Sequence, residues 1–193
     1  IGVVQKGSFN SGDAVTARVD ELRRRRIMSN HSVCHLLQLA LREVLGTHVH
    51  QAGSYYDEHR CRFDFSHFSA MTKEEIQQVQ DKVNRMILEG HPVQIEELPI
   101  AEAKNKGAMA LFGEKYGDIV RVCTMGDSVE FCGGTHVANT AQIGVVKIIS
   151  ESSVAAGVRR IEAATGMGVL ELLDNAEGVI NAVASEFKAA GQA

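Results

Sequence analysis

The sequence lacks long hydrophobic runs, and its first residues lack the layout of a signal peptide. A membrane-spanning helix needs about 20 consecutive apolar residues, and no stretch of this chain approaches that length. We therefore expect no association with a membrane. The sequence also lacks an initiator methionine and opens with Ile1-Gly2-Val3, which resembles the middle of a strand, so we expect an excised fragment of a longer protein.

Cysteine is scarce and the charge is nearly balanced. The four cysteines have no small-scaffold spacing, which favours a reducing compartment and a cytoplasmic location. A formal net charge of −4 provides no global attraction to nucleic acid, so any RNA contact must come from local basic patches. The length of 193 residues suffices for one sizeable globular domain with appendages, and we find no internal repeats.

What is present is a helix-forming stretch that carries two histidines. Its apolar residues recur at helical spacing, namely Val33, Leu36, Leu37, Ala40, Leu41, Val44 and Leu45. We expect a helix over residues 29–45. His31 and His35 then share one face, on a stripe with Gln38 and Arg42. Each histidine could be a satisfied core residue, but the pair is also suited to grip a metal ion.

A second candidate metal-binding segment lies at residues 132–136, where the sequence is C-G-G-T-H. Its two glycines permit a tight backbone that other residues resist, so Cys132 and His136 could fold back onto one ion. Together with the helix this makes a nitrogen and sulfur ligand set typical of zinc. We predict one zinc ion per chain, and its four ligands are His31, His35, Cys132 and His136.

A series of motifs carries a resemblance to a known family. In order, they are N-H-S-V-C-H-L-L at 30–37, Q-A-G-S at 51–54, R-F-D-F-S-H at 62–67, G-A-M-A-L-F-G-E-K-Y-G-D at 107–118, V-R-V at 120–122, C-G-G-T-H at 132–136 and S-E-S-S-V-A-A-G-V-R-R-I-E-A at 150–163. Together they resemble the editing domain of alanyl-tRNA synthetase and its free-standing relatives, the AlaX-type deacylases. The block at 107–116 points to the synthetase.

The resemblance implies an α+β fold of the threonyl/alanyl-tRNA synthetase second additional domain type. Helices interspersed with hairpin-linked strands agree with it, because they indicate an antiparallel-rich sheet covered by helices. The expected strands lie within 48–66 and at 93–98, 119–125, 144–151 and 158–164, and the expected further helices at 72–90 and 100–106.

We expect three regions along the chain. Residues 1–22 are predicted to form short strands, the remnant of a small β-barrel, and residues 23–166 the zinc-containing editing domain. Residues 167–193 are predicted to form a C-terminal helical tail, whose apolar stripe either packs back or self-associates with another copy. The four arginines at 23–26 indicate either a solvated junction or a phosphate contact.

The resemblance also implies an activity, namely hydrolysis of the ester that links serine or glycine wrongly to alanine tRNA. The partner would be the acceptor end of that tRNA. An apolar pocket rejects an added hydroxyl weakly, whereas a second site that hydrogen-bonds the hydroxyl can favour serine over alanine. The chain has no ATP-binding segment, so ATP binding and alanine activation are expected of the full-length synthetase alone. Two alternatives stay open: an RNA-binding module with a structural zinc, and a hydrolase for small esters or amides.

Three residues are candidates for catalysis, namely Ser32, Gln51 and Thr135. Ser32 lies where relatives carry Thr or Ser, and its hydroxyl could bond the substrate serine, a water, or backbone in the helix. Gln51 matches the family's strand glutamine beside the cleft, and an amide can both donate to and accept from water. The alternative is that Gln51 is a surface strand residue.

Three further residues are candidates for substrate or tRNA binding, namely Gly133, Gly134 and Arg159. Backbone N–H groups of the glycine turn, and of Thr135 next to it, could face an oxyanion or the terminal ribose, or the turn could simply present the ligands. Arg159 matches the family's R-R-I-E-A, and its alternative role is a structural ion pair. Four protein ligands are typical of closed structural zinc sites, whereas catalytic sites keep one position open, so the role of the metal stays undecided here.

Overall fold

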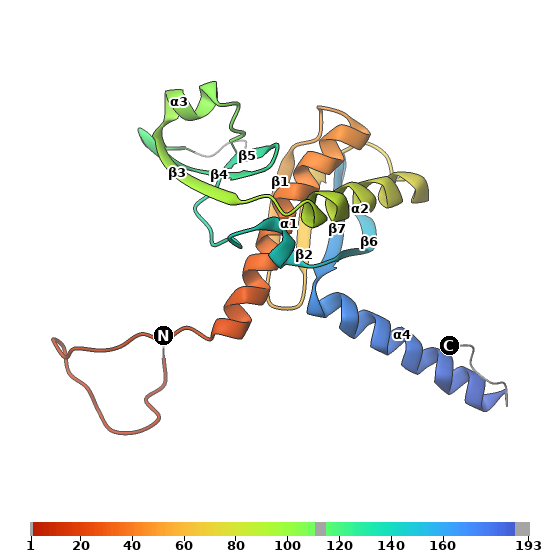
Figure 1. The fold of residues 1–193 in the computed structure, drawn as a ribbon, viewed down its shortest axis with the longest axis horizontal. Coiled ribbons are helices and arrows are strands. Elements are labelled where there is room, and N and C mark those ends of the chain that lie inside the picture. Colours follow the sequence, from red (N-terminus) through yellow and green to blue (C-terminus); the bar gives the residue numbers. More distant parts are fainter. Residues whose placement is uncertain (1, 111–114, 188–193) are drawn as a thin grey trace.

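The computed structural model describes residues 2–110 and 115–187. Over these ranges it contains two antiparallel sheets together with helices, which confirms the predicted α+β class (Figure 1). The helices are α1 (Glu21–Leu45), α2 (Lys73–Leu88), α3 (Ile100–Asn105) and α4 (Met167–Glu186), with a 3₁₀ turn η1 (Thr140–Ile143). The strands are β1 (Gln51–Tyr56), β2 (Cys61–Ser66), β3 (Val93–Pro99), β4 (Ile119–Met125), β5 (Ser128–Phe131), β6 (Val146–Ala155) and β7 (Val158–Thr165). Residues 111–114 of the motif at 107–118 and the end of the tail lie outside the described ranges.

The central helix α1 begins at Glu21, well before the predicted start at residue 29. Asp20 explains the earlier start, because its carboxylate accepts a hydrogen bond from the Arg23 amide at 2.8 Å and so caps the helix. The arginine run therefore forms the first turns of α1. Its ion pairs are Arg23 with Glu58, Arg25 with Glu21 and Arg26 with Glu171. These carboxylate partners favour the structural interpretation of the run over a phosphate contact.

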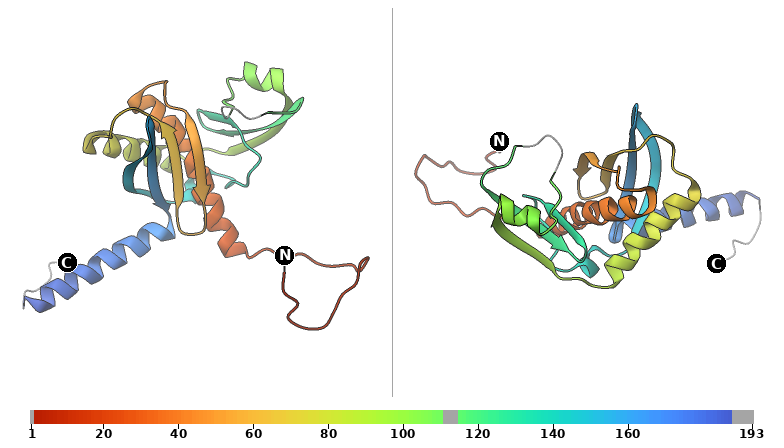
Figure 2. Two further views of the ribbon diagram at one scale, coloured as in Figure 1. Left: turned by 180° about the vertical axis from the view of Figure 1, so that it is seen from behind. Right: turned by 90° about the horizontal axis from the view of Figure 1, so that it is seen from above.

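The larger sheet has the strand order β1-β2-β7-β6, and every neighbouring pair is antiparallel. Its inward-facing residues on β2 and β7 are fully buried, and they include Phe63, Phe65 and Ile161. α1 packs on β1, β2 and β7, while α2 lies beside α1 and contacts β6 (Figures 1 and 2). This layer of helices on one sheet is the predicted arrangement.

A second sheet, with the order β3-β4-β5, stands apart from the larger one, and β5 is not among the expected strands. Strand alternation gives β4 two buried faces. Val120 and Val122 pack in a small core with Ala103 of α3, whereas Cys123 and Met125 join the main core under α1. The strand β4 thus couples the small sheet to the body of the domain.

The predicted strands of residues 1–22 are wrong for this structure. Residues 2–20 form no strand, and their side chains are exposed, including Val15 at 76% and Val19 at 57%. Apolar alternation stabilises a strand only when a neighbouring strand and a covering layer are present. The assignment of this segment to a barrel remnant stays a prediction.

The C-terminal helix is confirmed as α4, which extends away from the body of the molecule (Figures 1 and 2). It does not pack back along its length, since Val169 is its buried residue, Leu172 is half-buried and most of the other large apolar residues are exposed. The exposed members are Leu170, Leu173, Val179, Ile180, Val183 and Phe187. Self-association through this stripe stays a prediction. Among the described helices, none is long and apolar enough to cross a membrane.

Candidate metal centre

Helix α1 provides the first half of the predicted site. His31 and His35 lie one turn apart, each 6% exposed, with ring centroids separated by 5.5 Å. Tyr56 of β1 stacks on the His31 ring at 3.9 Å between centroids and an interplanar angle of 10°. The helix and the stacked ring together restrict the orientation of His31.

Strand β5 leads to the second half of the predicted site. The alternating directions of its side chains decide which of them point toward α1. Val129 and Phe131 face the small core, so Ser128 and Glu130 face the opposite way. Accordingly, the Ser128 hydroxyl lies 3.5 Å from the His35 carbonyl oxygen. Cys132 follows with the same parity as Glu130 and so points toward the two histidines.

The four predicted ligands converge on one point. Their ligand atoms all lie within 4.8 Å of one another, in the set His31, His35, Cys132 and His136. The Cys132 Sγ atom is 3.2 Å from His136 Nε2 and 3.5 Å from His31 Nε2. Residues far apart in the sequence are therefore brought together as the motifs predicted.

A set of hydrogen bonds orients these side chains. His35 Nδ1 lies 2.7 Å from a carboxylate oxygen of Glu130, which leaves Nε2 of that ring to face the centre. Ser32 Oγ lies 3.2 Å from His136 Nδ1 and accepts a hydrogen bond from the Val137 amide at 3.2 Å. Partners of this kind fix the ring and tautomer of a metal-binding histidine.

The turn that carries Cys132 is held down by Arg121 of β4. Its guanidinium donates to the carbonyl oxygens of Cys132 at 2.6 Å and Gly134 at 2.8 Å. Gly134 lies so close to His31 that a Cβ atom there would sit 2.0 Å from the ring atom Cε1. Glycine is therefore required at 134 by close approach, whereas a Cβ at Gly133 would meet nothing within 4 Å.

The electrostatics of the cluster favour an anionic sulfur. Burial raises the pKa of the Cys132 thiol, but hydrogen bonds with His136 and His31 and the positive charge of His35 outweigh burial and lower the pKa to about 3. Burial lowers the pKa of His35, but the negative charges of Glu130 and Cys132 raise it to about 10. Burial lowers the pKa of His136. A thiolate surrounded by imidazole nitrogens is an arrangement that a bound cation stabilises.

The unpaired atoms of the site also fit a metal ion. His31 Nδ1 and His35 Nε2 are buried and have no hydrogen-bond partner within the described ranges. Buried polar atoms of native proteins usually have a partner, so His35 Nε2, which faces the centre, points to an absent one, whereas His31 faces Cys132 through Nε2. Three imidazoles and one thiolate are ligands that can hold a metal ion together.

A cavity of about 260 Å³ opens beside the cluster. It is lined by His31, Cys34, His35, Gln51, Ser54, Tyr56, Tyr116, Glu130, Phe131, Cys132, Gly133 and Gly134. The structure thus brings Gln51, Gly133 and Gly134 next to the ligands, and Thr135 is exposed on the same turn. Cys34 is another thiol near the two histidines, but it lines the cavity instead of joining the cluster, and its Sγ donates to the Asn30 carbonyl oxygen.

The structure places Ser32 away from the cavity, and its predicted role at the substrate stays a prediction. Ser32 is 0% exposed, does not line the cavity, and lies behind His136 with its hydroxyl already bonded. Its position on α1, one residue after His31, turns it toward the segment 136–137. Ser32 therefore orients a ligand in the structure.

Arg159 is not brought to the cluster either. Its guanidinium forms a two-bond ion pair with Glu151 of β6, with N–O distances of 2.5 and 2.8 Å. The neighbouring Arg160 makes a similar pair with Asp64 at 2.6 and 2.7 Å. Both pairs agree with the structural alternative for these arginines, and a tRNA contact by Arg159 stays a prediction.

Three residues of the centre were missed by reasoning from the sequence, namely Glu130, Tyr56 and Arg121. Glu130 carried a signal, because it lies two residues before Cys132 and a strand places such residues on one side. Arg121 carried only its place in the V-R-V motif at 120–122, and Tyr56 carried no signal, since their roles depend on how two sheets meet around α1.

Comparison with known proteins gives first a family match over part of the chain. Residues 120–162, which run from β4 through the turn to β7, match the family described as the threonyl and alanyl tRNA synthetase second additional domain. The matched range includes Cys132 and His136, so the family segment coincides with half of the metal centre.

Almost the whole chain is similar to alanine–tRNA ligases. It is 56% identical over 188 residues to the enzyme of Bacillus pumilus, 54% over 188 residues to that of Bacillus subtilis, and 55% over 189 residues to alanine–tRNA ligase 1 of Lachnoclostridium phytofermentans. Each match covers 97% of this chain, which spans only 21 to 22% of the length of these relatives. The resemblance to the alanyl-tRNA synthetase domain is thereby confirmed.

The low pKa of Cys132 predicts selective alkylation of the metal-free protein. Iodoacetamide should label Cys132 nearly as fast at pH 5 as at pH 7, because its pKa of about 3 keeps it a thiolate throughout. An ordinary thiol would slow by about 100-fold over that interval. Peptide mapping by mass spectrometry gives the site and rate.

The other cysteines provide internal controls for this experiment. A hydrogen bond with Cys61 and burial raise the pKa of Cys34, and burial raises that of Cys123 to about 12. Added zinc should protect Cys132. Equal labelling of all four cysteines, or a steep fall in the Cys132 rate at pH 5, would contradict the charge state described above.

The two glycines of the turn predict opposite outcomes for the same substitution. Gly134→Ala should weaken zinc affinity by about 10-fold or more, because the added Cβ displaces the His31 ring. Gly133→Ala is the matched control and should keep the affinity of the parent. Competition with a chromogenic chelator measures both, and equal affinities for the two variants would refute the close approach.

Proposed function

We propose that this chain hydrolyses the ester of alanine tRNA mischarged with serine or glycine, as an editing domain does. The observation that carries the proposal is the cluster of His31, His35, Cys132 and His136, which opens onto a cavity containing Gln51. The motif resemblance and the similarity to alanine–tRNA ligases support the substrate class.

We assign zinc to the cluster, because three imidazoles and a thiolate are the donors that zinc prefers. When bound, zinc supplies a positive charge that stabilises developing negative charge on the reacting ester. Glu130 keeps a proton on His35 Nδ1, and Ser32 keeps His136 oriented, so that both rings present Nε2.

Gln51 is proposed to position the attacking water. It lies at the start of β1 on the cavity wall, and its amide donates to Ser54 Oγ at 3.0 Å, which leaves its carbonyl oxygen to accept from water. Backbone N–H groups of Gly133 and Thr135 are proposed to face the ester oxygen that becomes negative. A hydrogen-bonding wall of this kind suits serine better than alanine, because serine alone carries the extra hydroxyl.

A second candidate is a module that holds the tRNA acceptor end around a structural metal without hydrolysing the ester. The proximity of four protein ligand atoms, all within 4.8 Å, favours it, since structural zinc sites are closed by four ligands. Such a module would bind mischarged tRNA and release no amino acid.

The wider setting is also proposed. The chain spans about a fifth of its alanine–tRNA ligase relatives, so tRNA as partner, a role in protein synthesis and a cytoplasmic location are proposed by similarity. Self-association through the exposed stripe of α4 is proposed on the exposure of Leu173, Val179 and Ile180.

Release of serine from seryl-tRNA(Ala) tests the proposed function directly. The parent protein should release serine. Cys132→Ala should lose the metal, and its metal affinity and rate of serine release should both fall by more than the about 10- to 100-fold that is typical of changes outside the ligand set. Filter assays on radiolabelled serine, metal analysis and a thermal unfolding curve give the three readouts. No release by the zinc-loaded parent would favour the binding module, and full activity in a metal-free variant would remove the metal from the reaction.

Two further variants separate positioning of a ligand from positioning of water. Ser32→Ala should lower zinc affinity by about 10- to 100-fold and reduce hydrolysis of seryl- and glycyl-tRNA alike, because it frees the His136 ring. Gln51→Ala should reduce hydrolysis of both substrates while zinc affinity stays unchanged. A loss by Ser32→Ala that is confined to seryl-tRNA, with zinc affinity intact, would instead assign Ser32 to the substrate hydroxyl.

A further inference from the structure

The number of ligands at the metal centre poses a chemical difficulty for the proposed hydrolysis. Four protein ligands close a tetrahedral zinc site, whereas a zinc ion that takes part in catalysis keeps one position open. The four ligand atoms of the cluster all lie within 4.8 Å of one another. If one of them left, such a position would open, and the contacts of the four side chains differ enough to identify which one it is.

The first difference is the position of each ligand relative to the cavities. His31, His35 and Cys132 line the cavity of about 260 Å³ that also contains Gln51. His136 does not line it, and instead lines a separate cavity of about 690 Å³. A ligand that makes room for a substrate beside Gln51 should come from the first group, so His136 is not the candidate.

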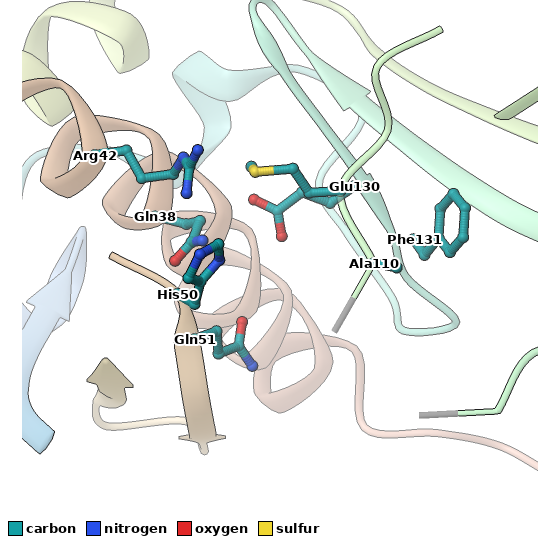
Figure 3. A pocket seen from close by; sticks show the side chains of 8 residues that line it. Gln38, Arg42, His50, Gln51, Ala110, Glu130 and Phe131 are labelled. Carbon is teal, nitrogen blue, oxygen red and sulfur yellow. The ribbon is translucent and has the colours of Figure 1, made fainter. Parts of the chain in front are cut away.

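His35 is anchored through its outer ring nitrogen. Its Nδ1 lies 2.7 Å from a carboxylate oxygen of Glu130. Figure 3 shows that carboxylate directed toward α1, at the edge of a neighbouring cavity of about 200 Å³. Both side chains are buried, and a hydrogen bond to a charged partner is stronger than one between neutral groups. Departure of the His35 ring would break this bond.

Cys132 is anchored through the turn that carries it. Arg121 donates to the carbonyl oxygens of Cys132 and Gly134, and the Gly134 amide donates to Cys132 Sγ at 3.5 Å. These bonds hold the backbone on both sides of the sulfur and the sulfur itself. Cys132 is therefore not free to leave unless the turn is rebuilt.

His31 has no anchor of this kind. Its Nδ1 is buried and has no hydrogen-bond partner among the residues that the structure describes. Tyr56 stacks on its ring with 3.9 Å between centroids, and the backbone of Gly134 lies against its edge. Stacking restrains the tilt of a ring but binds neither nitrogen, whereas hydrogen bonds fix the outer nitrogens of His35 and His136. His31 is thus the least firmly held of the ligands that line the cavity.

We propose that His31 is the exchangeable ligand of the centre and that Tyr56 keeps it in place until a substrate enters the cavity. This inference deepens the function proposed above and rests on it for its purpose. When the His31 ring leaves, Nε2 keeps its lone pair, and no proton or electron is transferred. The vacated position faces the cavity that contains Gln51. Three protein ligands remain, which is the number that catalytic zinc sites use.

NMR spectroscopy of the zinc-loaded protein labelled with ¹⁵N-histidine tests the exchange, because the shift of an imidazole nitrogen reports whether it binds the metal. Serine hydroxamate is the probe, since it offers oxygen atoms to zinc and carries the serine side chain. The probe should move the His31 Nε2 signal to the shift of a free imidazole, while His35 and His136 keep metal-bound shifts. The spectrum of His31→Ala assigns the signal.

Each other result of this titration would overturn the proposal. Loss of the metal-bound shift at His35 or His136 would assign the exchange to another ligand. Binding of the probe with all three histidines still bound would mean that the ion expands its coordination instead. A zinc-loaded protein that does not bind the probe would have a closed centre, as the binding module requires.

Removal of single histidines gives an independent measure. His31→Ala should weaken zinc affinity by about 10- to 100-fold, as changes outside a ligand set do, because His31 is held least firmly. His35→Ala is the matched comparison on the same helix and should weaken the affinity by more than about 100-fold. Competition with a chromogenic chelator measures both. Equal losses in the two variants would contradict an exchangeable His31.

Substitutions at Tyr56 test what holds His31 in place. Tyr56→Leu should tighten the binding of serine hydroxamate by about 2- to 10-fold, because the His31 ring then leaves more easily. Tyr56→Phe keeps the stacked ring and should keep the affinity of the parent. Tyr55→Leu is the matched control, since Tyr55 is 49% exposed and does not line the cavity. Unchanged or weaker binding by Tyr56→Leu would exclude Tyr56 from this role.

These measurements need no hydrolysis, so the exchange and the proposed function can fail separately. Exchange of His31 without release of serine from seryl-tRNA(Ala) would support an open centre while the hydrolytic function fails. Release of serine by a protein whose three histidines all stay bound to zinc would overturn the exchange and leave the hydrolytic function standing.

Discussion

Four side chains from two distant segments must meet at one point, and the rest of the domain is arranged to hold them there. α1 is fixed by burial against β1, β2 and β7, which determines where His31 and His35 point. β5 is held by its pairing with β4 and by the burial of every second side chain in the small core, which directs Glu130 and Cys132 to the other side. The centre therefore depends on the rotational setting of a helix and the register of a strand. A change in either would separate the ligands without altering any of them.

The hydrogen bonds around the ligands belong to the same constraint. Glu130 and Ser32 each engage the ring nitrogen that faces away from the centre, so two histidines present the same nitrogen inward. Arg121 holds the turn by donating to two carbonyl oxygens of the turn. Gly134 leaves the space beside His31 that any side chain at this position would fill. The same stripe of α1 continues to Gln38 and Arg42, which line a cavity beside the metal centre.

The ligands could be predicted from the sequence because His31, His35, Cys132 and His136 sit in local patterns of spacing and glycine content. The strands of the larger sheet and α2 could be predicted for the same reason. Partners across the fold could not, since Tyr56 and Arg121 act only once two sheets enclose α1. The start of α1 was missed because a single aspartate, Asp20, decides it. Strands were wrongly expected within residues 1–22 because alternation of apolar residues does not reveal whether a partner strand exists.

The separation of the ligands along the chain has a consequence for folding. His31 and Cys132 are 101 residues apart, and the loop between them contains β1 to β5, α2 and α3. An ion held by both would act as a cross-link across this loop, comparable in its effect on chain entropy to a disulfide that encloses about 100 residues, which is worth about 4.7 kcal/mol in that model. It would tie the small sheet to α1 independently of packing. The four ligand atoms would then cross-link the chain through the ion, and loss of the ion would loosen the half of the domain that lies inside the loop.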